Sequence, residues 1–241
     1  MVVSLHIREN NCNFALIIKN HSETGSVIHS KDQEVMLECW MIHNVLEAGC
    51  DEAGRGPLAG SVFAAAVILP QNEALLHDRL AGLNDSKQLT EHERERLRPI
   101  IEEVALYWAV AEVTPEEIDR LNILNSSILA MHKALQKLPV EPGHILVDGN
   151  RFKPYISSST GMAIAHRTVV KGDGKYMSIA AASVLAKTYR DDYMRRLHAE
   201  YPQYGWDRNM GYPTQEHRRA VLKYGMTPYH RKTFTFRTDD C

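Results

Sequence analysis

Two kinds of hydrophobic pattern alternate along most of this chain. Short, nearly continuous apolar runs are typical of buried strands, and they occupy residues 62–69, 105–113, 144–147 and 163–170. A further apolar pair, Val45-Leu46, comes shortly before residue 51. Longer segments repeat apolar residues at helical spacing, and these are 91–103, 115–137, 177–201 and 215–224. The pattern therefore predicts strands that alternate with helices.

Local signals support the predicted helices. Thr90 opens a capping-box motif, and Thr114 stands before Pro115, a favoured first helical residue. The helix that begins at Met177 starts with small apolar residues, so we expect its first half to be buried close to the sheet. We expect its charged part, 190–196, to be exposed.

The order of these elements indicates an α/β fold. Consecutive strands before residue 114 suit an antiparallel meander, whereas strands separated by helices favour parallel pairing. We predict one mixed sheet flanked by helices, with a helical C-terminal part, in a single domain over 45–235 followed by a tail at 236–241. Residues 1–44 have weak periodicity apart from a candidate strand at 14–18. We expect them to form a poorly ordered extension whose removal up to Met41 leaves activity intact.

Composition restricts the class of protein. Hydrophobic residues make up 44% and charged residues 24% of the 241 positions, as in ordinary soluble domains. No apolar run approaches the roughly 20 residues of a membrane span, and the N-terminus does not have the pattern of a secretory signal. The 4 cysteines are scattered without a Cys-x-x-Cys pair. This spacing argues against a zinc site or a disulfide framework and favours a reducing compartment, the cytoplasm.

Charge is distributed unevenly along the chain. The formal net charge is −2, but residues 1–141 hold 12 basic and 21 acidic side chains, whereas residues 142–241 hold 16 and 9. A basic half suggests a surface that binds a polyanion. The alternative is that the fold intermixes the two halves, and the sequence leaves both open.

The most distinctive stretch contains two adjacent acids, Asp51 and Glu52, followed by Gly54-Arg55-Gly56. Glycines let a ligand approach the main chain, whose amides can donate to a sugar or a phosphate, and Arg55 adds charge suited to a phosphate. Adjacent strand residues point to opposite faces, so we expect both acids at a bending strand end. Taken alone, the stretch is equally compatible with an ordinary turn that carries acids.

Two further acids share this setting. Asp148 and Asp173 each follow an apolar strand and begin a glycine-containing turn, and in open α/β sheets sites form beyond the carboxyl ends of strands. Four converging carboxylates repel one another, and a divalent cation relieves that repulsion. An all-oxygen ligand set favours Mg²⁺ or Mn²⁺, and two such ions about 4 Å apart can promote phosphodiester hydrolysis. The alternative is four unrelated loop acids.

Several motifs occur in order between Leu46 and Phe234. They are DEAGRGPLAG at 51–60, NDSKQL at 84–89, VDGN at 147–150, KGDGK at 171–175, SIAAAS at 178–183, GYPT at 211–214 and PYHR at 228–231. In this combination the chain resembles the bacterial type 2 ribonucleases H, specifically ribonuclease HII. The related ribonuclease HIII has a sizeable N-terminal binding domain and lacks the Gly-Arg-Gly form of the loop, so the resemblance favours HII.

The resemblance implies a ribonuclease H-like fold and an endonuclease. Such an enzyme cuts the RNA strand of RNA–DNA hybrids, and cuts 5′ of single ribonucleotides in duplex DNA, leaving 3′-hydroxyl and 5′-phosphate ends. The implied catalytic residues, which bind two Mg²⁺ or Mn²⁺ ions, are Asp51, Glu52, Asp148 and Asp173. The implied protein is a monomer.

The resemblance also implies how substrate is recognised. The loop Gly54, Arg55 and Gly56 would read the 2′-hydroxyl at the ribonucleotide–deoxyribonucleotide junction, and Tyr212 would stack on the neighbouring sugar. Candidates for further substrate contacts are Ser86, Lys87 and Lys171. The alternative for these three is that they are solvated loop residues.

Two other functions remain open. A metal-dependent phosphatase also uses clustered acids, although its Asp-x-Asp nucleophile pattern near a strand end is missing here. A non-catalytic nucleic-acid-binding module would not need four acids that face a polyanion. Activity on a small phosphate ester would favour the first alternative, and hybrid binding without Mg²⁺-dependent cleavage would favour the second.

Overall fold

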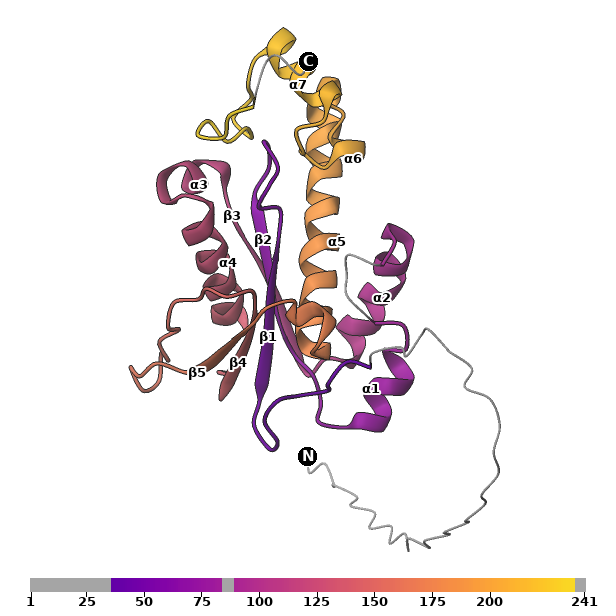
Figure 1. The fold of residues 1–241 in the computed structure, drawn as a ribbon, viewed down its shortest axis with the longest axis vertical. Helices are drawn as coiled ribbons and strands as arrows, with labels where there is room; N and C mark the ends of the chain where they lie inside the picture. The colour runs from indigo at the N-terminus through magenta and orange to yellow at the C-terminus, as the bar shows by residue number, and fades with distance from the viewer. Residues whose placement is uncertain (1–35, 84–88, 237–241) are drawn as a thin grey trace, which may run out of the picture. The chain divides into compact units, whose positions relative to one another are not determined.

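The computed structural model describes residues 36–83 and 89–236 of the chain. Within these ranges, five strands form one mixed sheet in the order β3-β2-β1-β4-β5 (Figure 1). The strands are β1 (Glu47–Ala53), β2 (Val62–Ile68), β3 (Tyr107–Val113), β4 (His144–Asp148) and β5 (Ala165–Val169). Antiparallel pairs join β1 to β2 and β2 to β3, whereas β4 pairs parallel with both β1 and β5. The predicted combination of an antiparallel meander with parallel strands is confirmed.

Helices cover both faces of this sheet. They are α1 (Glu73–Arg79), α2 (Glu91–Val104), α3 (Pro115–Leu121), α4 (Ile123–Lys137), α5 (Met177–Glu200), α6 (Trp206–Asn209) and α7 (Gln215–Tyr224). One face carries α5, with α2 beside it, and the other carries α4, which follows α3 (Figure 1). All residues of β2 are buried because this strand lies between the two helical layers, which explains its continuous apolar sequence.

The long helix α5 approaches β1 closely because both surfaces carry small residues. A Cβ added to Gly49 would lie 2.2 Å from the backbone carbon of Ser178, so a larger residue would push the helix off the sheet. The first half of α5 is buried, as predicted. The prediction that residues 190–196 are exposed holds only for Arg196. Arg190 and Met194 are buried under the C-terminal part of the chain, and the other four residues are partly buried.

Two local predictions about helices need correction. The segment 115–137 forms two helices, because Asn122 between them has a φ of 65°. Its side chain accepts a hydrogen bond from the amide of Asn125 at 3.1 Å and so caps α4. The hydrophobic pattern also missed α1, a short helix that Asn72 caps and that Leu76 anchors in the core. In both places the helix begins after a polar capping residue, and the spacing of apolar residues does not indicate where that residue lies.

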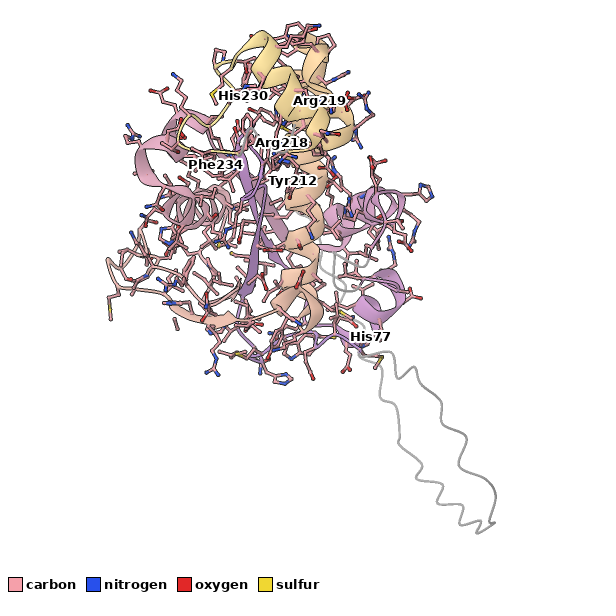
Figure 2. All side chains as sticks on the ribbon, turned by 45° about the horizontal axis from the view of Figure 1, so that its top comes forward. His77, Tyr212, Arg218, Arg219, His230 and Phe234 are labelled. Atoms are coloured by element: carbon pink, nitrogen blue, oxygen red, sulfur yellow. The ribbon has the colours of Figure 1, made fainter. Side chains whose placement is uncertain are left out.

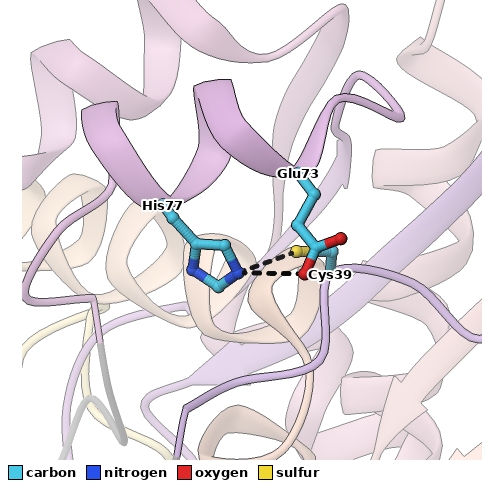
Figure 3. Close-up of side chains that lie close together, drawn as sticks. All are labelled: Cys39, Glu73 and His77. Atoms are coloured by element: carbon cyan, nitrogen blue, oxygen red, sulfur yellow. Dashed lines mark hydrogen bonds and ion pairs between the residues drawn. The ribbon is translucent and has the colours of Figure 1, made fainter. Parts of the chain in front are cut away.

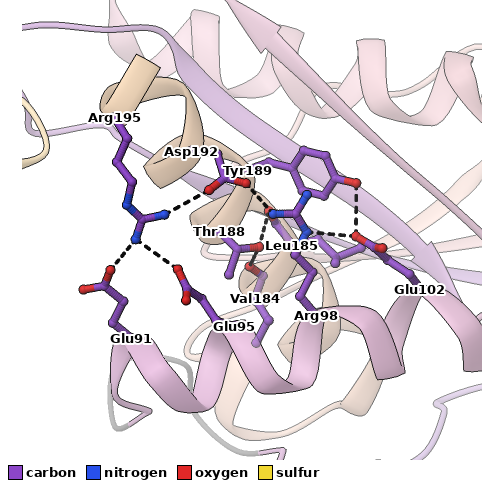
Figure 4. A network of polar contacts seen from close by, with 10 residues as sticks. All are labelled: Glu91, Glu95, Arg98, Glu102, Val184, Leu185, Thr188, Tyr189, Asp192 and Arg195. Atoms are coloured by element: carbon purple, nitrogen blue, oxygen red, sulfur yellow. Dashed lines mark hydrogen bonds and ion pairs between the residues drawn. The ribbon is translucent and has the colours of Figure 1, made fainter. Parts of the chain in front are cut away.

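Charged side chains join α2 to α5 (Figure 4). Arg195 on α5 donates to Glu95 on α2 at 3.0 Å. Arg98 on α2 donates to Asp192 at 2.6 Å, and its guanidinium lies 3.8 Å from the ring centroid of Tyr189. Partly exposed ion pairs of this kind each contribute little free energy, but together they fix the orientation of α2 on α5.

The segment that leads into β1 is attached to the domain. Leu37 is buried in the core between the sheet and α1, α2 and α5. The amide of Glu38 donates to the carbonyl of Lys175 at 2.7 Å, and the amide of Met177 donates to the carbonyl of Glu38 at 2.9 Å. The candidate strand at 14–18 and residues 237–241 lie outside the described residues. No helix in the described ranges is long and apolar enough to cross a membrane.

Candidate active site

The first two acids lie inside β1 rather than at its end. The strand continues to Ala53, and Asp51 and Glu52 pair with Ala65 and Ala64 of β2. The prediction that both acids stand at a bending strand end is therefore wrong. Both nevertheless line one cavity, and the carboxylate of Asp51 accepts a hydrogen bond from the amide of Glu52 at 2.7 Å.

Parallel pairing brings the third acid beside the first. Cys50 pairs with Val147 across β1 and β4, so the next residue on each strand, Asp51 and Asp148, reaches the same edge of the sheet. Asp148 is the last residue of β4, as predicted. The strand-end position thus explains its place in the cavity.

A short turn after β5 supplies the fourth acid. Asp173 lies buried within the 3₁₀ turn Gly172–Gly174. The amide of Gly172 donates to Oδ1 of Asp148 at 2.7 Å, and this bond ties the turn to β4. Lys171, which precedes the turn, is exposed and has a φ of 55°.

Burial and mutual repulsion perturb the acids on β1. The pKa of Asp51 is raised well above its usual value, chiefly by burial and then by the nearby charges of Glu52 and Asp148, while a hydrogen bond from Ser183 opposes the shift. Burial also raises the pKa of Glu52, against the effect of Arg55, whose Nη1 lies 3.1 Å from Oε1 of Glu52. Acids in such a cluster favour either a proton or a cation nearby.

The donor set suits a hard divalent cation. All four acids line one cavity of about 840 Å³, and no cysteine or histidine is among the described residues of its lining. Oxygen donors without nitrogen or sulfur are typical of Mg²⁺ and Mn²⁺ sites. The four acids therefore fit the metals expected from the sequence, and their role as ligands stays a prediction.

A buried arginine holds the Gly-Arg-Gly loop from inside the protein. The guanidinium of Arg231 donates to the carbonyl oxygens of Gly54 at 2.6 Å, Arg55 at 3.0 Å and Gly60 at 2.8 Å. In a trans peptide the C=O and the following N–H point in opposite directions. The amides of Arg55 and Gly56 therefore point away from Arg231.

A second buried arginine supports the same loop. Arg190 of α5 donates to the carbonyl oxygens of Ala59 at 3.2 Å, Ser61 at 3.1 Å and Met210 at 3.0 Å. Gly54 has a φ of 91°, and a Cβ there would lie 2.0 Å from Nε of Arg190. The first glycine of the loop is thus required both by its conformation and by this close contact.

A chain of hydrogen-bonded rings leads to Tyr212. This exposed side chain lies beside the loop, 3.4 Å from the position that a Cβ on Gly56 would take. The carbonyl of Tyr212 is 2.9 Å from Nδ1 of His217, whose Nε2 is 3.0 Å from Nε1 of Trp206 and 3.1 Å from Nε2 of His230. Figure 2 shows Tyr212 and His230 at the same end of the domain.

The cavity gathers most of the predicted site residues. Besides the four acids it is lined by Gly54, Arg55, Gly56 and Tyr212. Lys171 is not part of the lining, and Ser86 and Lys87 lie outside the described residues. The lining adds basic side chains that sequence reasoning did not select, namely Arg94, Lys187, Arg190 and Arg208.

Sequence reasoning also missed the residues that support the loop. Arg190 lies in a stretch that is mostly charged, and Arg231 lies in a basic and aromatic segment near the C-terminus. Both patterns suggest exposure. The available signal was the PYHR motif, because a charged residue within an apolar and aromatic setting is a candidate for a buried polar role.

The mixed sheet flanked by helices is a ribonuclease H-like fold, and its cavity gathers the four acids. The model of the ribonuclease HII family matches residues 48–237. The chain belongs to the ribonuclease HII family, and it is a ribonuclease H.

Comparisons with individual proteins agree with this assignment. The ribonuclease HII of Phocaeicola vulgatus is 61% identical over 202 residues, which cover 83% of this chain and 94% of the relative. The ribonuclease HII of Bacteroides thetaiotaomicron is 59% identical over 204 residues, covering 85% and 96%. The crystal structure of ribonuclease H2 from Pyrococcus horikoshii OT3 matches with a TM-score of 0.64 and 31% identity over 78% of this chain and 93% of that one. The PCNA:RNase HII complex of Archaeoglobus fulgidus gives a TM-score of 0.63 and 28% identity over 81% and 100%.

Proposed function

We propose that this ribonuclease H cuts the RNA strand of RNA–DNA hybrids and also cuts 5′ of single ribonucleotides in duplex DNA, leaving 3′-hydroxyl and 5′-phosphate ends. The ribonuclease HII family acts on RNA–DNA hybrids. The observation that carries the finer proposal is one cavity lined by four acids, the Gly-Arg-Gly loop and Tyr212. It combines groups suited to phosphodiester hydrolysis with groups suited to recognising a sugar.

The proposed cofactors are two Mg²⁺ or Mn²⁺ ions, held by Asp51, Glu52, Asp148 and Asp173. When bound, such ions supply activation of a water and stabilisation of the leaving oxygen. The chain itself orients the carboxylates: Ser183 and the amide of Glu52 bond to Asp51, and the amide of Gly172 bonds to Asp148. These hydrogen bonds limit the rotation of both side chains and so pre-organise the oxygens.

Recognition of the ribonucleotide is assigned to the loop and the tyrosine. The 2′-hydroxyl is the group that distinguishes RNA from DNA. The amides of Arg55 and Gly56, which point away from Arg231, are the donors we propose for it, and the exposed ring of Tyr212 offers a stacking face for the neighbouring sugar. Ser86, Lys87 and Lys171 remain proposed contacts to the rest of the substrate.

A duplex that carries one ribonucleotide tests the proposal directly. We expect a single cut on the 5′ side of that ribonucleotide in the presence of Mg²⁺ or Mn²⁺, and no cut after chelation. Sequencing-gel analysis of the labelled strand gives the cut position. Tight binding without metal-dependent cleavage would support a non-catalytic module instead, and turnover of a small phosphate ester would support a phosphatase.

Removing one acid tests the catalytic cluster. Asp51→Asn should lower the cleavage rate about 10²–10³-fold, because one electrostatic group at the reacting centre contributes on that scale. The metal-free variant should melt no lower than the wild type, since burial disfavours the charge of Asp51. Asp192→Asn makes the same chemical change outside the cavity, on the α2–α5 contact, and should cleave normally. Near-normal cleavage by Asp51→Asn would exclude the metal-site proposal.

Replacing the tyrosine tests junction recognition. Tyr212→Ala should lose more activity on a single embedded ribonucleotide than on a continuous RNA–DNA hybrid, because only the first substrate needs the junction contact. Tyr212→Phe retains the ring and should stay close to the wild type. An equal loss on both substrates would contradict the stacking role.

We also propose that the protein acts as a monomer in a reducing, cytoplasmic compartment. The scattered cysteines support the compartment, and sedimentation of the purified chain at several concentrations tests the oligomeric state. A concentration-dependent dimer would contradict the monomer.

A further inference from the structure

A second group of potential ligands lies outside the acid-lined cavity. Glu73 and His77 are one helical turn apart on α1 and share a face of that helix. Cys39, from the segment before β1, faces them (Figure 3). Sγ of Cys39 lies 3.7 Å from Nε2 of His77, and that nitrogen lies 3.5 Å from Oε1 of Glu73. The three ligand atoms all lie within 4.8 Å of one another.

The two distances from Nε2 of His77 are close to those of a tetrahedral metal centre. Zn²⁺ binds cysteine sulfur at about 2.3 Å and histidine nitrogen or carboxylate oxygen at about 2.0–2.2 Å. Tetrahedral angles then place sulfur about 3.5 Å from nitrogen, and nitrogen about 3.3 Å from oxygen. The observed distances to Cys39 and Glu73 each exceed these values by only a few tenths of an ångström.

We propose that Cys39, Glu73 and His77 bind one Zn²⁺ ion, with water as the fourth ligand. The three residues line a surface cavity of about 290 Å³, which leaves room for that water. Binding needs the thiolate, so the proton of Cys39 is released to solvent as the Zn–S bond forms. A thiolate, a carboxylate and a neutral imidazole then balance the two charges of the ion.

The surroundings of Cys39 favour a cation. The carboxylate of Glu73 belongs to the same cluster, and its negative charge would attract a metal ion. The sulfur of Met177, 3.9 Å from Sγ, adds a second soft atom to this environment.

The site would connect three parts of the domain. Cys39 follows Glu38, whose main chain bonds to Lys175 and Met177 at the start of α5. A metal ion would therefore clip α1 to the segment before β1 and stabilise the backbone next to the Asp173 turn. The cavity around Cys39 shares no described lining residue with the cavity of the four acids, and His77 lies far from Tyr212 in Figure 2.

The spacing of the cysteines in the sequence argues against a zinc site, whereas the fold brings together ligands that are far apart in the chain. The ligands are separated along the chain by 38 residues between Cys39 and His77, so no short motif contains them. Only the packing of α1 against the segment at 36–40 brings the thiol to the helix face.

Cobalt(II) provides a test, because a Co²⁺–thiolate bond gives an intense near-ultraviolet charge-transfer absorption that carboxylates do not produce. We expect the full chain to develop this band with one equivalent of Co²⁺ and to lose it when Zn²⁺ is added. Cys39→Ser should abolish the band, and His77→Gln should weaken binding about 100-fold, at least the effect of losing an outer-shell partner. The matched control Cys12→Ser/Cys241→Ser should keep the band, and so should Asp51→Asn.

A melting experiment gives an independent readout. Zn²⁺ should raise the melting temperature of the wild type and of the Cys12→Ser/Cys241→Ser control, because a ligand that binds only the folded state stabilises it. Cys39→Ser should show a smaller rise, because only the four acids of the other cavity remain to bind the ion. A thiolate band that persists in Cys39→Ser, its absence from the wild type, or an equal melting shift in Cys39→Ser would each overturn the proposal.

Discussion

At the scale of single residues, the support of the Gly-Arg-Gly loop rests on two arginines that bind carbonyl oxygens. Arg231 and Arg190 are almost completely buried, and each donates to three different main-chain carbonyls. Burial and the charge of Arg190 lower the pKa of Arg231 to about 9, so this guanidinium stays charged at neutral pH. Buried charge of this kind is stabilised only while its hydrogen bonds are complete, which makes the loop conformation depend on both side chains.

The first prediction concerns Arg231. Arg231→Gln should reduce the free energy of unfolding by about 3 kcal/mol, because it leaves buried carbonyl oxygens without a donor. It should also lower cleavage at a single ribonucleotide more than cleavage of a continuous hybrid, because the loop amides lose their fixed direction. Urea unfolding and the ratio of the two cleavage rates measure these effects.

Two further variants test whether the charge of Arg231 or its arrangement of hydrogen-bond donors is responsible for these effects. Arg231→Lys restores the charge without the forked donors, so it should recover stability only in part and leave the substrate ratio low. Arg219→Gln makes the same change at an exposed arginine of α7 and should leave both quantities unchanged. Full recovery of the ratio by lysine would show that charge, and not geometry, is what Arg231 provides.

At the scale of elements, apolar patterning predicted the segments whose burial is uniform. β2 and α5 lie against other layers along much of their length, so their sequences report their environment directly. The pattern could not show that 115–137 breaks at Asn122, because apolar residues continue at helical spacing on both sides. It also could not show that β1 extends past Asp51 and Glu52, because two acids inside a buried strand resemble the end of one.

The break at Asn122 gives the second prediction. Its φ of 65° and ψ of 163° lie in a region that side chains rarely adopt, and its side chain caps α4. Asn122→Ala should therefore lower the free energy of unfolding by about 1–2 kcal/mol through the lost cap. Asn122→Gly relieves the backbone strain and should be less destabilised. Equal unfolding midpoints for the alanine variant and the wild type would contradict the assigned role of the cap.

In the candidate site, too, local sequence patterns identify some residues, whereas others depend on contacts between segments far apart in the chain. Asp148 and Asp173 could be selected from the sequence because each follows a strand and begins a glycine turn. The contribution of Ser183 to Asp51, and of Arg231 to Gly54, depends on packing between segments far apart in the chain. Such contacts have no local pattern, and only the shared motifs of a family indicate them.

At the scale of the whole molecule, the start of the domain gives the third prediction. Residues 36–39 bring a buried leucine and two main-chain hydrogen bonds to the core. A chain that begins at Met36 should match the full chain in urea unfolding. A chain that begins at Met41 should be less stable by about 2 kcal/mol or more, because it loses the side chain of Leu37. The sequence-based expectation that activity survives a start at Met41 therefore holds only if the truncated chain is still stable enough to stay folded. Equal stability of the two truncated chains would refute the role of Leu37.

The last prediction follows from the histidines that connect the C-terminal part to the site. The amide of Thr227 donates to Nδ1 of His230 at 2.9 Å, so the proton of His230 lies on Nε2 and is directed at His217. His217 in turn accepts from Trp206 on Nε2 and donates from Nδ1 to the carbonyl of Tyr212. Nδ1 of His230 and Nε2 of His217 thus each accept a hydrogen bond from an N–H group, which requires both rings to be neutral. Burial lowers the pKa of His217, and burial together with the neighbouring His217 lowers the pKa of His230 to about 4.

Stability from this pair should therefore be lost in acid. An unfolded histidine has a pKa of about 6.5, so as the pH falls below that value the unfolded chain takes up protons before the folded one does. The contribution is complete above pH 6.5 and declines toward about pH 4. Urea unfolding at a series of pH values should show this slope in the wild type, whereas His230→Gln should be less stable at pH 7 but depend less on pH. Other titrating groups, including Asp51, affect both proteins alike, so the difference between the two curves isolates the pair. Parallel curves would show that neutral histidines do not hold the C-terminal part against the loop.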